Sequence, residues 1–159
     1  MLEGAWDVAF DPAMGGPERV RFDALDDWST RPEPGIRYYS GIATYRKTFD
    51  LPRRTDLPPG SKLHLDLGEV QVMARVRVNG QDCGVAWTAP WRVDISDAVQ
   101  ATGNTVEVEV ANLWPNRMIG DARSPGQTFT RTTYRPYQAK HPLLPSGLRG
   151  PVRLMNAPE

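Results

Sequence analysis

The sequence contains one cysteine, Cys83, and only two histidines. A lone cysteine can form neither a disulfide within the chain nor a cysteine-based metal site. His64 and His141 stand far apart, and His64 alternates with leucines on the wet face of a predicted strand, so we expect no metal site built on histidine. No cofactor is therefore expected, although a structural calcium ion held by loop oxygens stays open.

The chain also lacks a long apolar run. No segment approaches the ~20 residues that a bilayer-spanning helix needs, so we expect no membrane partner. The first residues, MLEGAWDVAF, lack the basic start and the long apolar segment of a signal peptide. The chain is thus either cytoplasmic or part of a longer exported protein. We expect the second, with an extracellular or periplasmic location within that parent.

Neither sign of charge dominates, because 19 basic residues balance 19 acidic ones. The arginines are scattered along predicted strands rather than gathered in one block, which argues against a nucleic-acid partner. The sequence has no Ser-His-Asp order, no P-loop and no dinucleotide fingerprint. Carboxylates such as Asp66, Glu69 and Asp94 are common in any domain of this size, whereas a glycosidase needs two at a fixed separation. We expect no catalytic residues, and so no enzyme in this chain alone.

What the sequence does contain is many short alternating runs, punctuated by 15 prolines and 14 glycines. The clearest lies between Leu65 and Ile95. One face of its first strand is apolar, and the residues on that face are Val72, Ala74, Val76 and Val78. This period of two is typical of a strand with one buried face. Asn79-Gly80 follows, a pair that favours a tight hairpin turn.

Other alternating runs begin at Trp6, Arg19, Tyr38, Leu63, Trp91, Val106 and Pro151. Together they predict an all-β fold, an antiparallel β-sandwich or jelly roll of about eight strands, with Trp28 covering its core. Residues 31–35 and 52–61 are predicted to be loops. A chain of 159 residues can bury about two thirds of its unfolded surface, so a single domain over 1–159 is expected. Its long segment at about 114–150 is predicted to be an irregular loop.

Several motifs resemble a known family. The runs YYSGIATYRKTFDLP (38–52) and LHLDLGEVQVMARVRVNGQDCGVAWTAPWRVDISDAV (63–99) resemble the sugar-binding jelly-roll domain of glycoside hydrolase family 2. The run ANLWPNRMIGD (111–121) is more specific, and resembles the β-sandwich domain near the C-terminal end of family 106 α-L-rhamnosidases. The resemblance extends from about Leu2 to Leu154.

The resemblance implies a galactose-binding-like β-sandwich that accompanies a catalytic domain. Such a domain is expected to be a non-catalytic carbohydrate-binding module of an α-L-rhamnosidase-like glycoside hydrolase acting on plant or microbial glycans. Its partners would be an oligosaccharide or polysaccharide, for example a rhamnose-containing one, and the catalytic domain of the parent enzyme.

Sugars are bound by aromatic faces and by amide, guanidinium or carboxylate groups. The predicted carbohydrate-binding residues are Trp87, Trp91, Asn112, Trp114, Asn116, Arg117, Asp121 and Tyr134. Trp87 is the better platform, because Trp91 alternates in phase with Val93 and is expected in the core. The loop 112–121 is the preferred site, although its amides can instead bond their own turns and Arg117 can pair with Asp121.

Two further aromatic groups leave alternatives open. Tyr38, Tyr39 and Ser40 precede a strand, where a tyrosine usually packs its ring and points its hydroxyl outward. Tyr134 and Tyr137 can bind sugar or pack against a neighbouring domain.

A different function is also compatible with these residues. The chain can be a structural domain that packs against a catalytic domain and shapes the rim of its active site. That alternative predicts an exposed apolar patch around Trp114, Ile119 and Tyr134.

Overall fold

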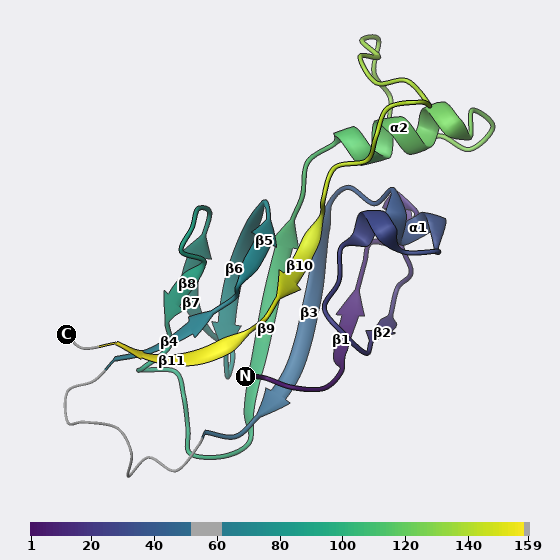
Figure 1. Ribbon diagram of the computed structural model, residues 1–159. Coiled ribbons are helices and arrows are strands. Elements are labelled where there is room, and N and C mark those ends of the chain that lie inside the picture. Colours follow the sequence, from purple (N-terminus) through teal and green to yellow (C-terminus); the bar gives the residue numbers. More distant parts are fainter. Residues whose placement is uncertain (52–61, 158–159) are drawn as a thin grey trace.

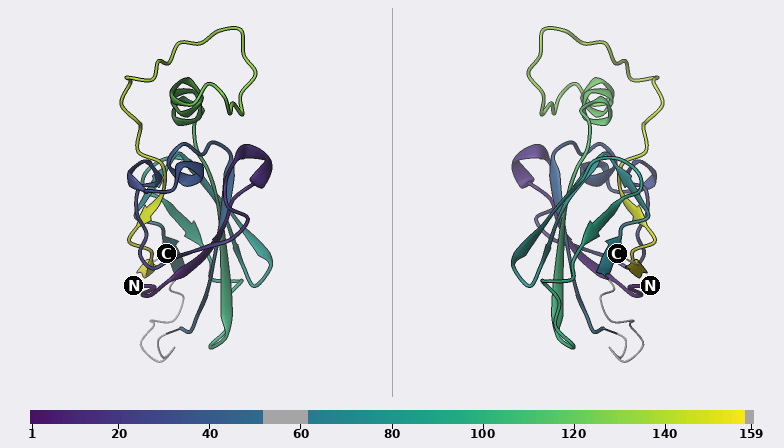
Figure 2. Two further views of the ribbon diagram at one scale, coloured as in Figure 1. Left: turned by 90° about the vertical axis from the view of Figure 1, so that its right-hand side faces the viewer. Right: turned by 90° about the vertical axis from the view of Figure 1, so that its left-hand side faces the viewer.

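Two layers of antiparallel strands form the body of the computed structural model, which describes residues 1–51 and 62–157 (Figures 1 and 2). The predicted loop 52–61 lies outside the described residues. One layer is a six-stranded sheet in the order β2-β1-β3-β9-β6-β7. Its strands are β1 (Trp6–Ala9), β2 (Val20–Phe22), β3 (Ile42–Phe49), β6 (Met73–Val78), β7 (Gln81–Ala86) and β9 (Asn104–Ala111).

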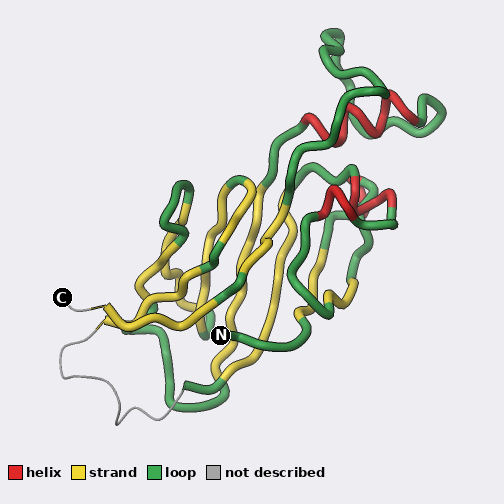
Figure 3. Tube along the Cα trace, viewed as in Figure 1, coloured by secondary structure: helices red, strands yellow, loops and turns green. Residues whose placement is uncertain are grey.

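The second layer is built from two small sheets. A three-stranded sheet has the order β11-β4-β8, and a pair joins β10 to β5. Their strands are β4 (Lys62–Asp66), β5 (Glu69–Gln71), β8 (Arg92–Asp94), β10 (Gly147–Gly150) and β11 (Arg153–Ala157). Strands dominate the trace in Figure 3, and the predicted all-β sandwich is confirmed.

The described residues form eleven strands rather than about eight. Short β5 is separated from β6 by a bend at Val72. Strand β10, with the sequence GLRG, has glycine at both ends, so it carries no alternating pattern to find. These strands are held by pairing with neighbours distant in sequence, which local periodicity does not report.

Alternation places the core between the layers. In β9, Val106, Val108 and Val110 are buried while Glu107 and Glu109 point to the other side of the sheet. The Asn79-Gly80 turn forms as predicted, with φ values of 53° and 81°, and joins β6 to β7. Both values are positive, as the tight turn requires.

Trp28 is fully buried, which confirms its predicted place over the core. Its indole Nε1 donates a hydrogen bond of 2.5 Å to the Tyr45 hydroxyl, which also accepts one from the Leu148 amide at 3.3 Å. Burial is the largest influence on Tyr45 and raises its pKa far above the usual range. Gly147 packs directly on the indole, and its φ of 95° is itself a glycine conformation.

The helices are short and lie at one end of the sandwich (Figure 1). Helix α1 (Pro34–Arg37) begins inside the predicted loop 31–35, so that prediction was wrong at its end. Strand β3 begins at Ile42 rather than at Tyr38. Helix α2 (Pro115–Arg123) and strand β10 both fall within 114–150, so the prediction of one irregular loop was wrong there.

Within residues 1–51 and 62–157, none of the helices has the length and apolar character that crossing a membrane demands.

Gly147→Ala should destabilise the domain, because the added Cβ would lie 2.3 Å from Trp28 Nε1 at a positive φ. Overpacking and left-handed strain together suggest a loss of about 2–4 kcal/mol. Urea denaturation of Gly126→Ala provides the matched control, since that position has open space around it. Equal stability of the two variants would contradict the packing described for Gly147.

Candidate functional site

Residues 114–146, named the arm below, contain α2 and the segment that returns to β10, and they extend beyond one end of the sandwich (Figures 1 and 2). Asn116 is buried in the arm. Its amide nitrogen donates to the Leu144 carbonyl at 2.7 Å and to Ser146 Oγ at 2.9 Å, and its oxygen accepts from the Leu144 amide at 2.8 Å. Its side chain therefore closes the arm at its base.

Arg117 and Asp121 form a buried ion pair on the next turn of α2. Arg117 Nε lies 2.9 Å from Asp121 Oδ1, and the side chains are 5% and 7% exposed. The guanidinium also lies 4.6 Å from the centre of the Phe129 ring. Burial lowers the pKa of Arg117, and the neighbouring carboxylate opposes part of that shift.

The other oxygen of Asp121 holds the returning segment. Oδ2 accepts hydrogen bonds from the Phe129 amide at 3.1 Å, the Thr130 amide at 2.8 Å and the Thr130 hydroxyl at 2.6 Å. The pairing of Arg117 with Asp121, one of the two possibilities raised by the sequence, is thus present. A carboxylate occupied by these partners has no oxygen to offer a ligand without breaking the arm.

Asn112 secures the point where β9 leaves the sheet. Its oxygen accepts from the Gly41 amide at 3.1 Å, and its nitrogen donates to the Tyr39 carbonyl at 2.8 Å. Ser40 Oγ donates to the Leu113 carbonyl at 2.8 Å. The side-chain amides of Asn112 and Asn116 therefore bond segments distant in sequence rather than their own turns.

The Tyr39 hydroxyl does not point outward as expected. It donates to the Ile42 carbonyl at 2.9 Å and accepts from the Asp11 amide at 3.1 Å. Tyr39 and Ser40 are buried, and this group belongs to the packing beneath the arm.

Three of the four aromatic candidates lie at the surface. Trp87, Trp114 and Tyr134 are 75%, 56% and 75% exposed. Trp91 is half-buried and packs against the core, in line with its phase. Ile119 is only 1% exposed, so the apolar patch expected around Trp114, Ile119 and Tyr134 does not include it.

Exposed apolar side chains gather instead at the arm end of the six-stranded sheet. Ala111 of β9 pairs with Ile42 on one side and Met73 on the other. Trp87 follows the end of β7, and Leu113 and Trp114 follow β9. We name this set the apolar rim, and its members are Ile42, Met73, Trp87, Leu113 and Trp114.

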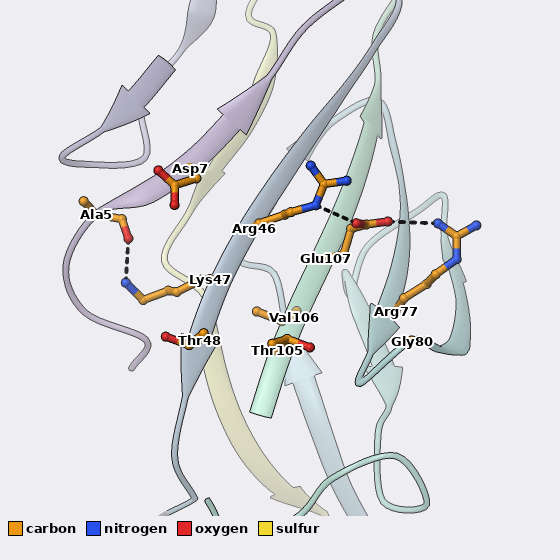
Figure 4. A pocket seen from close by; sticks show the side chains of 10 residues that line it. All are labelled: Ala5, Asp7, Arg46, Lys47, Thr48, Arg77, Gly80, Thr105, Val106 and Glu107. Carbon is orange, nitrogen blue, oxygen red and sulfur yellow. Dashed lines mark hydrogen bonds and ion pairs between the residues drawn. The ribbon is translucent and has the colours of Figure 1, made fainter. Parts of the chain in front are cut away.

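A polar groove of about 540 Å³ crosses the same sheet nearer its other end (Figure 4). Register places Arg46, Glu107 and Arg77 side by side on β3, β9 and β6. Arg46 Nε lies 2.8 Å from one oxygen of Glu107, and Arg77 Nη1 lies 3.2 Å from the other. Glu107 is therefore held between two guanidinium groups.

The walls of the groove add more polar groups. Asp7 stands opposite Arg46 on β1, and the exposed residues Thr48 and Thr105 lie at one end. Lys47 Nζ donates to the Ala5 carbonyl at 2.8 Å. Burial lowers the pKa of Lys47, and the charge of Arg21 adds to that shift.

Sequence reasoning did not find this groove. The alternation of charged and apolar residues shows that Arg46, Arg77 and Glu107 point away from the core. It does not show that β9 lies between β3 and β6, which are far from it in sequence. With the strand order known, the three side chains would have been predicted to lie side by side.

Among the described residues, no three or more histidine, cysteine, aspartate or glutamate side chains are grouped so as to hold a metal ion. Calcium binding stays an untested prediction. Cys83 is half-buried, and burial raises the pKa of its thiol.

The two-layer antiparallel sandwich, with its groove and its end loops, defines a β-sandwich of the galactose-binding-like type. A family described as "Glycosyl hydrolase 2 galactose-binding domain-like" matches residues 37–142. The chain belongs to this family, which confirms the resemblance seen in its motifs.

The chain is similar to a solved rhamnosidase from Novosphingobium sp. PP1Y, with 46% identity and a TM-score of 0.92 over 98% of this chain and 15% of that one. It is 38% identical to a putative beta-glucuronidase of Formosa agariphila, over 97% of this chain and 15% of the relative. A Ruminococcus gnavus beta-glucuronidase, with 23% identity, a TM-score of 0.57 and coverage of 70% of this chain and 20% of that one, shares the fold.

The chain thus spans about 15% of the length of the first two relatives. It is an accessory galactose-binding-like domain of glycoside hydrolases.

Asp121→Ala should disorder the arm, because it leaves the Arg117 guanidinium buried without its carboxylate. Breaking a buried pair costs about 3–5 kcal/mol. Hydrogen exchange should show lost protection at the Phe129 and Thr130 amides, which bond to Asp121. Asp82→Ala removes an exposed pair with Arg75 and is the control expected to leave these amides protected. Unchanged protection in the Asp121 variant would show that other contacts hold the arm.

Proposed function

We propose that this domain is the non-catalytic, carbohydrate-binding part of an α-L-rhamnosidase-like glycoside hydrolase, and that the polar groove is its binding site. The proposal is supported most by the groove itself, where fixed donors and acceptors line about 540 Å³ of open space. The choice of parent enzyme is supported by the similarity of nearly the whole chain to part of a solved rhamnosidase.

The chemistry of the groove suits the edge of a sugar ring. Vicinal hydroxyls present alternating donors and acceptors, and a guanidinium fork can donate to two of them at once. Glu107 can accept from a hydroxyl while Arg46 and Arg77 keep its oxygens in place. Among the described residues that line the groove there is no aromatic ring, so recognition would rest on hydrogen bonds. Such a site, open to solvent, predicts weak binding.

Glu107→Gln should weaken binding of rhamnose-containing oligosaccharides by about tenfold, since it removes the acceptor charge in the groove and the ion pair that aligns Arg46, while Arg77 keeps its pair with Glu109. Calorimetry and chemical-shift mapping at millimolar ligand provide the measurement, with stability expected to change little because the pairs are partly exposed. Asp82→Asn, on β7 outside the groove, is the matched control. Shift changes confined to Trp87 and Trp114 would rule out the groove.

A second function is favoured by the apolar rim. Five large apolar side chains exposed at one end of a sheet suit contact with another domain, as in interfaces with an apolar centre. The occupant would be the catalytic domain of the parent enzyme, and the domain would then help to shape the rim of the active site.

Trp87→Ala distinguishes a sugar platform from a docking residue. Because the ring is 75% exposed, the isolated domain should lose no more than about 0.5 kcal/mol, against the 3–5 kcal/mol of a core tryptophan. If the rim docks the catalytic domain, melting of the full parent enzyme should split into separate transitions while glycan binding by the isolated domain is unchanged. Arg19→Ala, at an exposed position outside the rim, the groove and the arm, is the control. Loss of glycan binding instead would identify Trp87 as a platform.

A further inference from the structure

Charge is distributed unevenly in this neutral chain. Residues 122–146 contain no aspartate or glutamate, but four basic residues, Arg123, Arg131, Arg135 and Lys140. Among the described residues, none of these four lies within ion-pair distance of a carboxylate. Arginines on the sandwich, such as Arg46 and Arg75, are paired. The returning part of the arm therefore carries a local positive charge of four with His141 neutral.

This charge is presented on an ordered support. Arg123 donates to the carbonyls of Ala139 at 2.8 Å and His141 at 3.2 Å, and to the Tyr38 hydroxyl at 3.1 Å. Asp121 fixes the start of the segment and Asn116 its end. Figure 2 shows the segment curving around α2, away from the sandwich. Binding of a partner there would therefore cost little conformational entropy, because the segment is already ordered.

The surface of the segment suits a saccharide better than a protein. Protein interfaces have an apolar centre, whereas the only large apolar side chain exposed over 122–140 is the Tyr134 ring. Its neighbours in sequence include the exposed residues Arg131, Thr133 and Arg135. Arginine pairs with carboxylates through two parallel hydrogen bonds, and an exposed ring can cover a sugar face.

We propose that the arm binds a carboxylate-bearing polysaccharide, a chain rich in uronic acid residues. Arg131 and Arg135 flank Tyr134 in sequence and would bind the carboxylates, while the ring contacts the sugar. This site is separate from the groove, and it does not depend on neutral saccharide binding there.

The double variant Arg131→Glu/Arg135→Glu tests the proposal by affinity electrophoresis and calorimetry with polygalacturonate. The wild-type domain should bind, more weakly as salt rises, and the double variant should lose about tenfold or more in affinity. Neither arginine makes a side-chain hydrogen bond or ion pair within the described residues, so the fold should be kept. Arg19→Glu/Arg153→Glu makes the same charge change at exposed positions outside the arm.

Fully methyl-esterified polygalacturonate should bind poorly, because its carboxylates are blocked. The proposal is overturned if the wild type does not bind polygalacturonate, if both double variants lose affinity equally, or if the esterified form binds as well. Equal affinity for polyglutamate or duplex DNA would show a general polyanion surface and would also overturn it. Glu107→Gln should leave polygalacturonate binding intact, which separates failure of the groove from failure of the arm.

Discussion

The Tyr45 hydroxyl is the interaction on which the sandwich most depends. It lies in the apolar interior and accepts hydrogen bonds from the Trp28 indole and from the Leu148 amide. An unpaired polar group at that depth would be costly, so each partner is needed. Trp28 and Leu148 belong to segments far apart in sequence, and the Tyr45 hydroxyl, on β3, joins both. Gly147 completes the arrangement, because only a residue without a side chain can lie against the indole there.

The same rule, that buried polar groups must be partnered, explains the arm. Asn116 and Asp121 are buried and hold the returning segment through hydrogen bonds, while the buried Arg117 pairs with Asp121 and lies over the Phe129 ring. The arm is thus ordered by polar contacts where the sandwich is ordered by apolar ones. That difference leaves its outer side free to be polar and charged.

The sandwich could be predicted from sequence where one face of a strand is buried. Val106, Val108 and Val110 alternate with glutamates, and Asn79-Gly80 marks its turn, because each pattern reports a local physical requirement. Helix α2 was missed because its interior side carries Asn116, Arg117 and Asp121 rather than an apolar stripe. Those residue types also suggested a ligand, since the chemistry that binds a sugar edge is the chemistry that braces a loop. The groove was missed because its side chains meet only across strand order.

Strand β9 carries Glu107 in the groove and ends at Ala111, directly before Asn112 at the base of the arm. Paired along both edges, by β3 and by β6, it cannot lengthen or bend freely. Five residues of extended backbone fix that interval at roughly 17 Å. The groove and the base of the arm are therefore held at a fixed separation. Once a long glycan is bound at one of the two surfaces, its effective concentration at the other is raised.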